Sequence, residues 1–429
     1  MAARHVEVRS TVERAVLVGL VTSSATDDGH RSLDELAGLA GAAGAAVVMR
    51  MLQERSRPDP ATFIGSGKVR ALAAACAELD ADVVIFDNEL TPGQLRELET
   101  RVERKVIDRT QLILDIFARR ARTREGKWQV ELAQLKYLLP RLAGSGAALS
   151  RLGGGIGTRG PGETKLEADR RRVRTRILAV EREIDQVSRR RSHLRERRQK
   201  QAVPTVALVG YTNAGKTTLF NRLTHASAAA SDALFVTLDP LVRRARLSDG
   251  RELLVSDTVG FIDRLPHTLV AAFSATLEEV VEADLILHVT DASAPDRGRH
   301  AAAVRRVLEE VGAADVATIS VFNKIDSIGA DARRRLRDSH PDAVLVSAAT
   351  GAGVADLLRR VASGLALDAQ RVRITFDPSS DVDRRRIGRL YRVARVVSHV
   401  ADAGREVIEA DVPRRLIGRL AAEVEVSSR

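Results

Sequence analysis

Gly210-Tyr211-Thr212-Asn213-Ala214-Gly215-Lys216-Thr217-Thr218 is the stretch that decides the fold of this 429-residue chain. It follows an apolar run at residues 206–209 and precedes a helix-forming run at residues 219–223. A strand, a glycine loop and a helix in this order predict a phosphate-binding loop, whose backbone N–H groups point at phosphate oxygens. Lys216 adds a positive charge for the β- and γ-phosphates, the Thr217 hydroxyl is a ligand for Mg²⁺, and the helix N-terminus favours an anion.

Two downstream segments are expected to complete the phosphate and Mg²⁺ site. Asp257-Thr258-Val259-Gly260 ends a predicted strand, so Asp257 is placed to hold Mg²⁺ through water and the Gly260 N–H to sense the γ-phosphate. Phe235-Val236-Thr237-Leu238-Asp239 lies about midway between Lys216 and Asp257. Its Thr237 is expected to join Thr217 on the metal when the γ-phosphate is present. Lys216, Thr237 and Gly260 are therefore the candidate catalytic residues.

The base is read by two segments that also follow strands. Asn323-Lys324-Ile325-Asp326 supplies Asp326, whose carboxylate accepts hydrogen bonds from guanine N1–H and the 2-amino group. Adenine has an acceptor at N1 and no 2-amino group, so a site built around such an acceptor rejects it. Ser347-Ala348-Ala349 then brings backbone groups to guanine O6. The nucleotide is predicted to be GTP, with GDP as the product.

Composition favours a cytoplasmic α/β protein. Hydrophobic residues make up 44% of the chain and aromatic residues 3%, which argues against an aromatic platform for single-stranded nucleic acid. One cysteine, Cys76, forms neither an internal disulfide nor a zinc site. The N-terminus lacks the apolar core of a signal peptide, and no apolar run of about 18 residues predicts a membrane span.

The positive charge is concentrated in one segment. The net charge is +11, yet residues 119–200 carry 23 Lys or Arg against 9 Asp or Glu. Helical patterns at residues 111–142 and 164–200 flank the glycine-rich run Gly153–Gly162, and Pro140 is expected to loosen the first helix. The pattern predicts a basic helical hairpin that contacts RNA through its tip. The alternatives are a solvated linker and peripheral association with an anionic membrane.

The flanking regions predict two smaller folding units. Strand and helix patterns alternate from Arg14 to Ala118, with Ser32 as a helix cap, and predict a small parallel sheet. Gly65-Ser66-Gly67-Lys68 is interpreted as a turn that caps a helix, because Thr62 stands where a phosphate loop needs its first glycine. From Arg371 onwards, two strands and two helices, the second at residues 414–421, predict a compact α+β unit.

The predicted domains are residues 1–118 (N-terminal α/β subdomain), 119–202 (basic helical hairpin), 203–368 (P-loop G domain) and 369–429 (C-terminal α+β domain). The fold class is therefore α/β. A monomer is the expected oligomeric state.

Several stretches together resemble a known family. They are Pro60-Ala61-Thr62-Phe63-Ile64-Gly65-Ser66-Gly67-Lys68, Ile107-Asp108-Arg109-Thr110-Gln111, the glycine-rich run through Gly162-Glu163-Thr164, the phosphate loop and Gly260-Phe261-Ile262. On these residues the chain resembles the HflX family of translational GTPases. The resemblance implies binding to the large ribosomal subunit and 70S ribosomes, with the glycine loop near the peptidyl-transferase region, and splitting or rescue of ribosomes under stress.

The chain departs from common GTPase patterns at two positions. Leu241-Val242-Arg243-Arg244 stands where similar proteins carry a Thr-Thr pair before arginine, which leaves Thr237 as the switch threonine. Phe261 stands where Ras-like GTPases carry a glutamine that orients the attacking water. This substitution predicts slow intrinsic hydrolysis with acceleration by the ribosome; alternatively Phe261 only packs and another residue positions the water.

The spacing of Asn213 within the phosphate loop resembles that in potassium-activated GTPases, which carry an asparagine at the equivalent position. Its side-chain carbonyl would help to hold K⁺ against the phosphates. The alternative is that Asn213 hydrogen-bonds a phosphate or stiffens the loop.

The function predicted from the sequence is GTP hydrolysis on the ribosome. Two other classes remain open: a GTPase acting on other RNA, in ribosome assembly or tRNA modification, and a nucleotide-gated scaffold at a membrane surface. Ribosome binding and ribosome-dependent hydrolysis distinguish the three.

Overall fold

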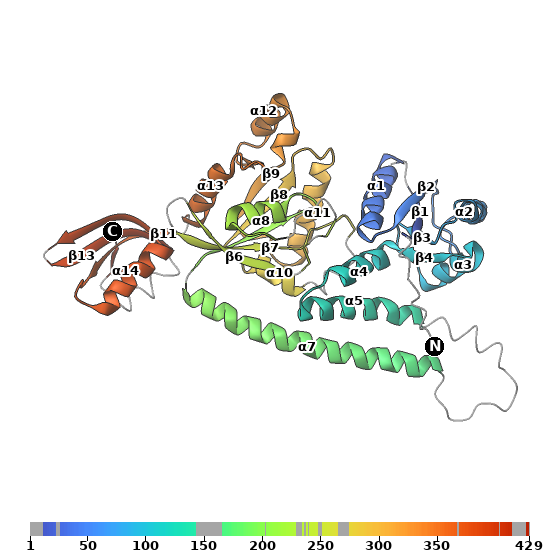
Figure 1. Ribbon diagram of the computed structural model, residues 1–429, viewed down its shortest axis with the longest axis horizontal. Coiled ribbons are helices and arrows are strands. Elements are labelled where there is room, and N and C mark those ends of the chain that lie inside the picture. The colour runs from blue at the N-terminus through green and yellow to red at the C-terminus, as the bar shows by residue number, and fades with distance from the viewer. Residues whose placement is uncertain are drawn as a thin grey trace, which may run out of the picture. The chain divides into compact units, whose positions relative to one another are not determined.

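Three β-sheets, each with its own core, make up the computed structural model (Figure 1). It describes residues 12–22, 26–142, 165–201, 203–228, 234–235, 237–238, 240–247, 251–264, 274–366, 369–402, 404–413 and 426–428. Two compact units are present, one extending to Asp185 and the other containing most of the chain that follows.

The first sheet is parallel, with strand order β2-β1-β3-β4. Its elements are β1 (Arg14–Val21), α1 (Thr26–Ala42), β2 (Ala46–Glu54), α2 (Ser66–Glu78), β3 (Val83–Phe86), α3 (Pro92–Val102), β4 (Lys105–Asp108) and α4 (Arg109–Arg120). Val16 and Phe86 pack on one face with Leu72 of α2 and Leu98 of α3. Helix α1 contacts β1, β2 and α4. Because helices cover the strands, all four residues of β3 are buried, which confirms the predicted parallel α/β subdomain.

Asp108 joins this sheet to the helices that follow. It is fully buried and accepts hydrogen bonds from the backbone N–H of Gln111 (2.9 Å) and of Leu90 (3.2 Å). It also accepts from the Tyr137 hydroxyl (2.9 Å) and from Arg141 Nη2 (3.0 Å), both on α5 (Arg124–Leu142). Burial raises the pKa of Tyr137 further above its usual range, so its hydroxyl remains a donor. One carboxylate thus caps α4 and anchors α5.

The helix predicted over residues 111–142 is two helices, so the single span is wrong. Helix α4 ends at Arg120, where Ala121 takes an extended backbone, and α5 begins at Arg124. The Thr123 hydroxyl accepts from the Gly126 N–H at 3.0 Å, which satisfies a donor at the start of α5. Pro140 and the glycines near Gly144 were expected to loosen this helix, and α5 is described to Leu142, two residues beyond Pro140. Because Pro140 stands in the last turn, it removes one hydrogen bond and α5 continues to Leu142.

Two predictions about helix starts had different outcomes. Gly65 is the N-cap residue of α2 and its N–H donates to Gln53 Oε1 at 2.9 Å, so the helix-start interpretation of residues 65–68 is confirmed. Ser32 is not a cap, because α1 begins at Thr26. Its hydroxyl instead donates to Asp87 Oδ2 at 2.6 Å.

The middle region contains the two predicted basic helices. Helix α7 (Lys165–Gln201) lies beside α5 and is joined to it by two ion pairs, Arg176 with Glu131 (2.6 Å) and Lys136 with Glu181 (2.9 Å). Val180 of α7 is buried. The glycine-rich tip, Gly153–Gly162, lies outside the described residues.

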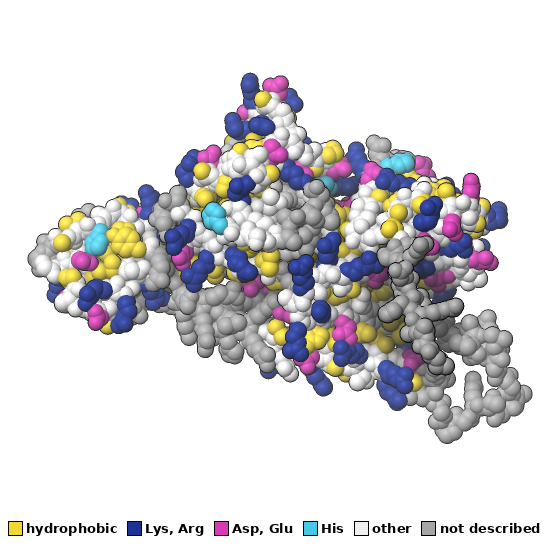
Figure 2. Space-filling view, in the orientation of Figure 1, with side chains coloured by type: hydrophobic (Ala, Val, Ile, Leu, Met, Phe, Trp, Pro, Cys, Tyr) yellow, Lys and Arg dark blue, Asp and Glu magenta, His cyan; other side chains and the backbone are white. Residues whose placement is uncertain are grey.

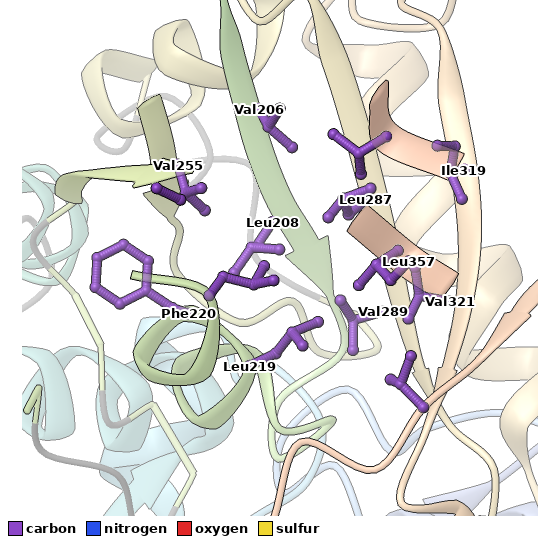
Figure 3. Close-up of a cluster of buried hydrophobic side chains, with 14 of the residues drawn as sticks. Val206, Leu208, Leu219, Phe220, Val255, Leu287, Val289, Ile319, Val321 and Leu357 are labelled. Atoms are coloured by element: carbon purple, nitrogen blue, oxygen red, sulfur yellow. The ribbon is translucent and has the colours of Figure 1, made fainter. Parts of the chain in front are cut away.

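The second sheet has strand order β10-β9-β8-β5-β7-β6, parallel except for the edge strand β6. Its elements are β5 (Thr205–Gly210), α8 (Lys216–Thr224), β6 (Leu241–Arg246), β7 (Glu252–Asp257), α10 (Ser274–Val281), β8 (Leu285–Asp291), α11 (Arg297–Glu310), β9 (Thr318–Asn323), a 3₁₀ turn (Ile325–Ser327), α12 (Ala330–Ser339), β10 (Val344–Leu345) and α13 (Val354–Ala366). Figure 3 shows Leu208 of β5 close to Leu219 and Phe220 of α8, with Leu357 of α13 in the same core. This packing fixes the start of α8 at the end of β5.

The third sheet is antiparallel, with strand order β12-β13-β11-β14. Its elements are β11 (Ala369–Phe376), α14 (Asp381–Val393), β12 (Arg395–Asp402), β13 (Arg405–Pro413) and β14 (Val426–Ser428). Val372, Ile374 and Phe376 alternate with more exposed residues and pack with Leu390 of α14. The predicted small α+β unit is confirmed, but the structure describes four strands where two were expected, and the helix expected at residues 414–421 lies outside the described residues.

Candidate functional site

The phosphate loop follows the C-terminal end of β5. Strand β5 is an interior strand of the second sheet. Gly215 is the N-cap residue of α8 and has a φ of 84°. A Cβ atom added to it would lie 2.3 Å from Asn323 Nδ2. Both the backbone angle and the close approach therefore require glycine here.

Lys216 is a buried cation at this loop. Its ammonium group donates to the carbonyl oxygens of Gly210 (3.0 Å) and Tyr211 (2.9 Å). Burial lowers the pKa of Lys216 to about 8, and the nearby Asp257 carboxylate partly offsets this effect. Phosphate oxygens beside Lys216 would favour its charged form.

The predicted Mg²⁺ residues meet around one carboxylate oxygen. The hydroxyls of Thr217 and Thr237 donate to Asp257 Oδ2 at 2.8 and 3.0 Å, and the two hydroxyl oxygens lie 2.8 Å apart. These residues come from the start of α8, the segment before β6 and the end of β7. The sequence alone predicted this convergence.

The second carboxylate oxygen of Asp257 supports a cation site. Asp257 is fully buried, and its Oδ1 has no hydrogen-bond partner within the described part of the chain. Burial raises the pKa of Asp257, although Lys216 and the two threonine hydroxyls oppose this shift. Hydroxyl and carboxylate oxygens are hard ligands, so the donor set fits Mg²⁺.

The Gly260 segment is hydrogen-bonded to the phosphate loop. The Thr212 N–H donates to the Phe261 carbonyl (2.7 Å), and the Phe261 N–H donates to the Gly210 carbonyl (3.1 Å). The side chain of Phe261 is fully buried. The ring therefore packs inside the domain, which both interpretations of this position allow.

Asn323 connects the phosphate loop to the base-reading loop. Its side-chain Nδ2 donates to the Ala214 carbonyl, and its Oδ1 accepts from the Ala348 N–H, both at 2.9 Å. Arg222 of α8 also reaches this loop, donating to the carbonyls of Ala348 (3.1 Å) and Ala349. No sequence motif marks Arg222, because both of its acceptors are backbone atoms 126 or more residues away.

Asp326 and Lys324 lie next to these loops. Asp326 is exposed, and a hydrogen bond from the Ser347 side chain lowers the pKa of its carboxyl group, so it remains an ionised acceptor. Lys324 pairs with Asp291 at 2.8 Å and contacts Asn213 Oδ1 at 3.5 Å.

Some predicted nucleotide residues have internal roles or cannot be placed. Thr258 is fully buried and its hydroxyl donates to the Leu208 carbonyl at 2.7 Å, while Ile325 packs in a small core. Val236 and Asp239 lie outside the described residues.

Comparisons with known proteins agree with this geometry. Three family models match in succession: "GTP-binding GTPase N-terminal" at residues 30–118, "GTP-binding GTPase Middle Region" at 120–198 and "50S ribosome-binding GTPase" at 205–324. The GTPase HflX of Lacrimispora saccharolytica is 50% identical over 82% of this chain and 83% of its own length. The GTPase HflX of Escherichia coli K12 is 45% identical over 89% of each chain, and that of Magnetococcus marinus 43% over 98% of this chain and 97% of its own. The chain therefore belongs to the HflX family of GTPases.

Proposed function

We propose that this protein hydrolyses GTP to GDP and phosphate on the large ribosomal subunit and the 70S ribosome, and that it splits or rescues ribosomes under stress. The observation that carries the proposal is the meeting of five separate segments through two buried side chains, Asp257 and Asn323. We propose that the protein hydrolyses GTP on ribosomes in the cytoplasm. We also propose that it acts as a monomer.

In the proposed reaction, Lys216, Thr237 and Gly260 surround the γ-phosphate. Thr217 and Thr237 would hold Mg²⁺ with Asp257 beside them, and the bound ion neutralises phosphate charge. Lys216 contributes a second positive charge from a buried position, where its field is weakly screened. Positioning and charge stabilisation account for most of the catalysis of phosphoryl transfer. Since the buried Phe261 ring cannot orient water, we expect slow intrinsic turnover that the ribosome accelerates.

The basic helices support a ribosomal partner. Figure 2 shows Lys and Arg side chains interspersed with Asp and Glu where α5 and the coloured part of α7 lie in Figure 1. Arg172 and Arg174 of α7 are exposed. Phosphate groups of rRNA suit such arginines, which form bidentate hydrogen bonds.

Co-sedimentation with ribosomes tests the function. We expect the full chain to bind more strongly with a non-hydrolysable GTP analogue than with GDP, and its GTP hydrolysis to rise when ribosomes are added. Binding to free RNA but not to particles would support the assembly or tRNA alternative. Binding to anionic vesicles alone would support the membrane switch; within the described residues, no helix is long and apolar enough to cross a membrane.

Deleting Gly153 through Gly162 is expected to leave GTP affinity unchanged while reducing ribosome-stimulated hydrolysis, because the glycine tip is separate in sequence from the nucleotide loop. The affinity of the wild-type protein for ribosomes should also fall as salt is added. In a plot of log affinity against log salt concentration, the slope should be roughly −1 for each phosphate contacted. Stimulated rates and sedimentation between low and moderate salt measure both effects. Full stimulation of the deletion variant, or a flat salt response, would contradict a role for the hairpin in rRNA binding.

We also propose that K⁺ is bound by the Asn213 side-chain carbonyl. Asn213 is exposed at the phosphate loop with a φ of 59°, and its Oδ1 accepts one long hydrogen bond, from Lys324 Nζ at 3.5 Å, among the residues that the structure describes. K⁺ at this position would neutralise charge that develops during phosphoryl transfer. Hydrolysis is therefore expected to be faster in KCl than in NaCl at equal ionic strength, and Asn213→Ala should remove the difference. Equal wild-type rates in the two salts would exclude the site.

A further inference from the structure

The hydroxyl group of Thr212 is buried without a partner. Thr212 is 7% exposed, and its Oγ1 has no hydrogen-bond partner among the residues that the structure describes. A buried hydroxyl in this condition lowers the stability of the fold. Such a group in a binding site points to a ligand that supplies the missing partner.

Thr212 lies beside Gly260, one of the groups that face the γ-phosphate in the proposed reaction. A Cβ atom added to Gly260 would lie 2.8 Å from Thr212 Cγ2 and 3.1 Å from Lys216 Nζ. The Thr212 backbone is held there by its N–H bond to the Phe261 carbonyl. Gly260 therefore lies against the Thr212 side chain, whose methyl group faces it, and beside the Lys216 ammonium group.

Other hydroxyl groups of the site are already engaged. The Tyr211 hydroxyl accepts from the Asp263 N–H at 2.7 Å, and the Tyr211 ring stacks on His300 at 3.8 Å. The Thr258 hydroxyl donates to a carbonyl, and those of Thr217 and Thr237 bond to Asp257. Among these hydroxyls, Thr212 alone has no hydrogen bond within the described chain.

We infer that Thr212 Oγ1 hydrogen-bonds the water that attacks the γ-phosphorus, an inference that rests on the proposed GTPase function. The hydroxyl accepts a hydrogen bond from the water and donates a hydrogen bond to a γ-phosphate oxygen, so Thr212 keeps its proton and stays neutral throughout. The water oxygen forms a bond to the γ-phosphorus, and the bond to the β–γ bridging oxygen breaks with its electron pair leaving on GDP. The protons of the water pass to the phosphate product. Thr212 thus takes the task that the glutamine performs in Ras-like enzymes.

Thr212→Val tests the inference, because valine keeps the shape and removes the hydroxyl. The single-turnover hydrolysis rate at saturating GTP is expected to fall roughly 10- to 100-fold, as for the loss of one hydrogen bond in a transition state. GDP affinity should not change. The melting temperature should stay equal or rise, because valine removes an unsatisfied hydroxyl. Thr212→Ser, which keeps the hydroxyl, should retain most of the rate.

Thr318→Val is a matched control in the same sheet. The Thr318 hydroxyl donates to the nearby Val316 carbonyl at 3.0 Å, so its loss should leave hydrolysis unchanged. Wild-type rates in Thr212→Val, or equal losses in the valine and serine variants, would overturn the role of the hydroxyl. Absence of hydrolysis in the wild-type chain with ribosomes would instead overturn the proposed function, and this inference with it.

Discussion

Asp326→Asn is expected to lower the affinity for GTP by about 100-fold or more and to raise that for xanthosine triphosphate. The carboxylate accepts from guanine N1–H and the 2-amino group, whereas the amide has one acceptor and would place its NH₂ against a guanine donor. Xanthine carries a carbonyl at that position, which accepts from the amide. The hydrogen bond from Ser347 holds the pKa of Asp326 below its usual range, so the wild-type group is ionised at neutral pH.

Equilibrium titration with both nucleotides measures this exchange. Asp331→Asn is a suitable control, since Asp331 is an exposed carboxylate in the first turn of α12. Its nucleotide affinities should match those of the wild type. An unchanged GTP affinity in Asp326→Asn would refute its part in reading the base.

Asp108→Ala is expected to reduce the free energy of unfolding of the N-terminal unit by about 3–5 kcal/mol, because it removes the carboxylate that a largely buried arginine, a tyrosine hydroxyl and two backbone N–H groups share. Asp108 is fully buried and Arg141 nearly so, with 14% of its side-chain surface exposed. The chain has one tryptophan, Trp128 on α5, whose fluorescence in urea reports the unfolding of this unit.

Asp34→Ala is the matched control. Asp34 also pairs with an arginine, Arg50, but 66% of its side-chain surface is exposed. Its loss should change stability by at most about 1 kcal/mol. Equal effects of the two substitutions would show that the Asp108 network contributes no more than a surface ion pair.

The strands that the sequence predicted well are buried on both faces. A run such as Val83–Phe86 is apolar throughout because helices cover it. Strand β6 was missed because it forms a sheet edge and reads Leu-Val-Arg-Arg-Ala-Arg. The break between α4 and α5 was missed because residues 121–123 contain neither glycine nor proline. It depends on Asp108 and on capping by Thr123.

The residues of the candidate site that could be predicted are those that lie at the ends of strands. Asp257 and Asn323 each end a strand of one sheet, so their meeting follows from the topology. Arg222 and the isolation of the Thr212 hydroxyl do not follow from it. The contacts of Arg222 and the missing partner of the Thr212 hydroxyl both depend on how separate loops pack. Local spacing in the sequence does not encode this packing.

Every described strand pairs within its own part of the chain. Strands β1–β4 come from residues 14–108, β5–β10 from 205–345 and β11–β14 from 369–428. During synthesis, the first sheet therefore has all of its strands before the second begins to leave the exit tunnel, and the second has all of its strands before the third. Since domains fold as units from the N-terminus during translation, this order suits a chain that folds vectorially and exposes few unpaired strand edges while it is being made.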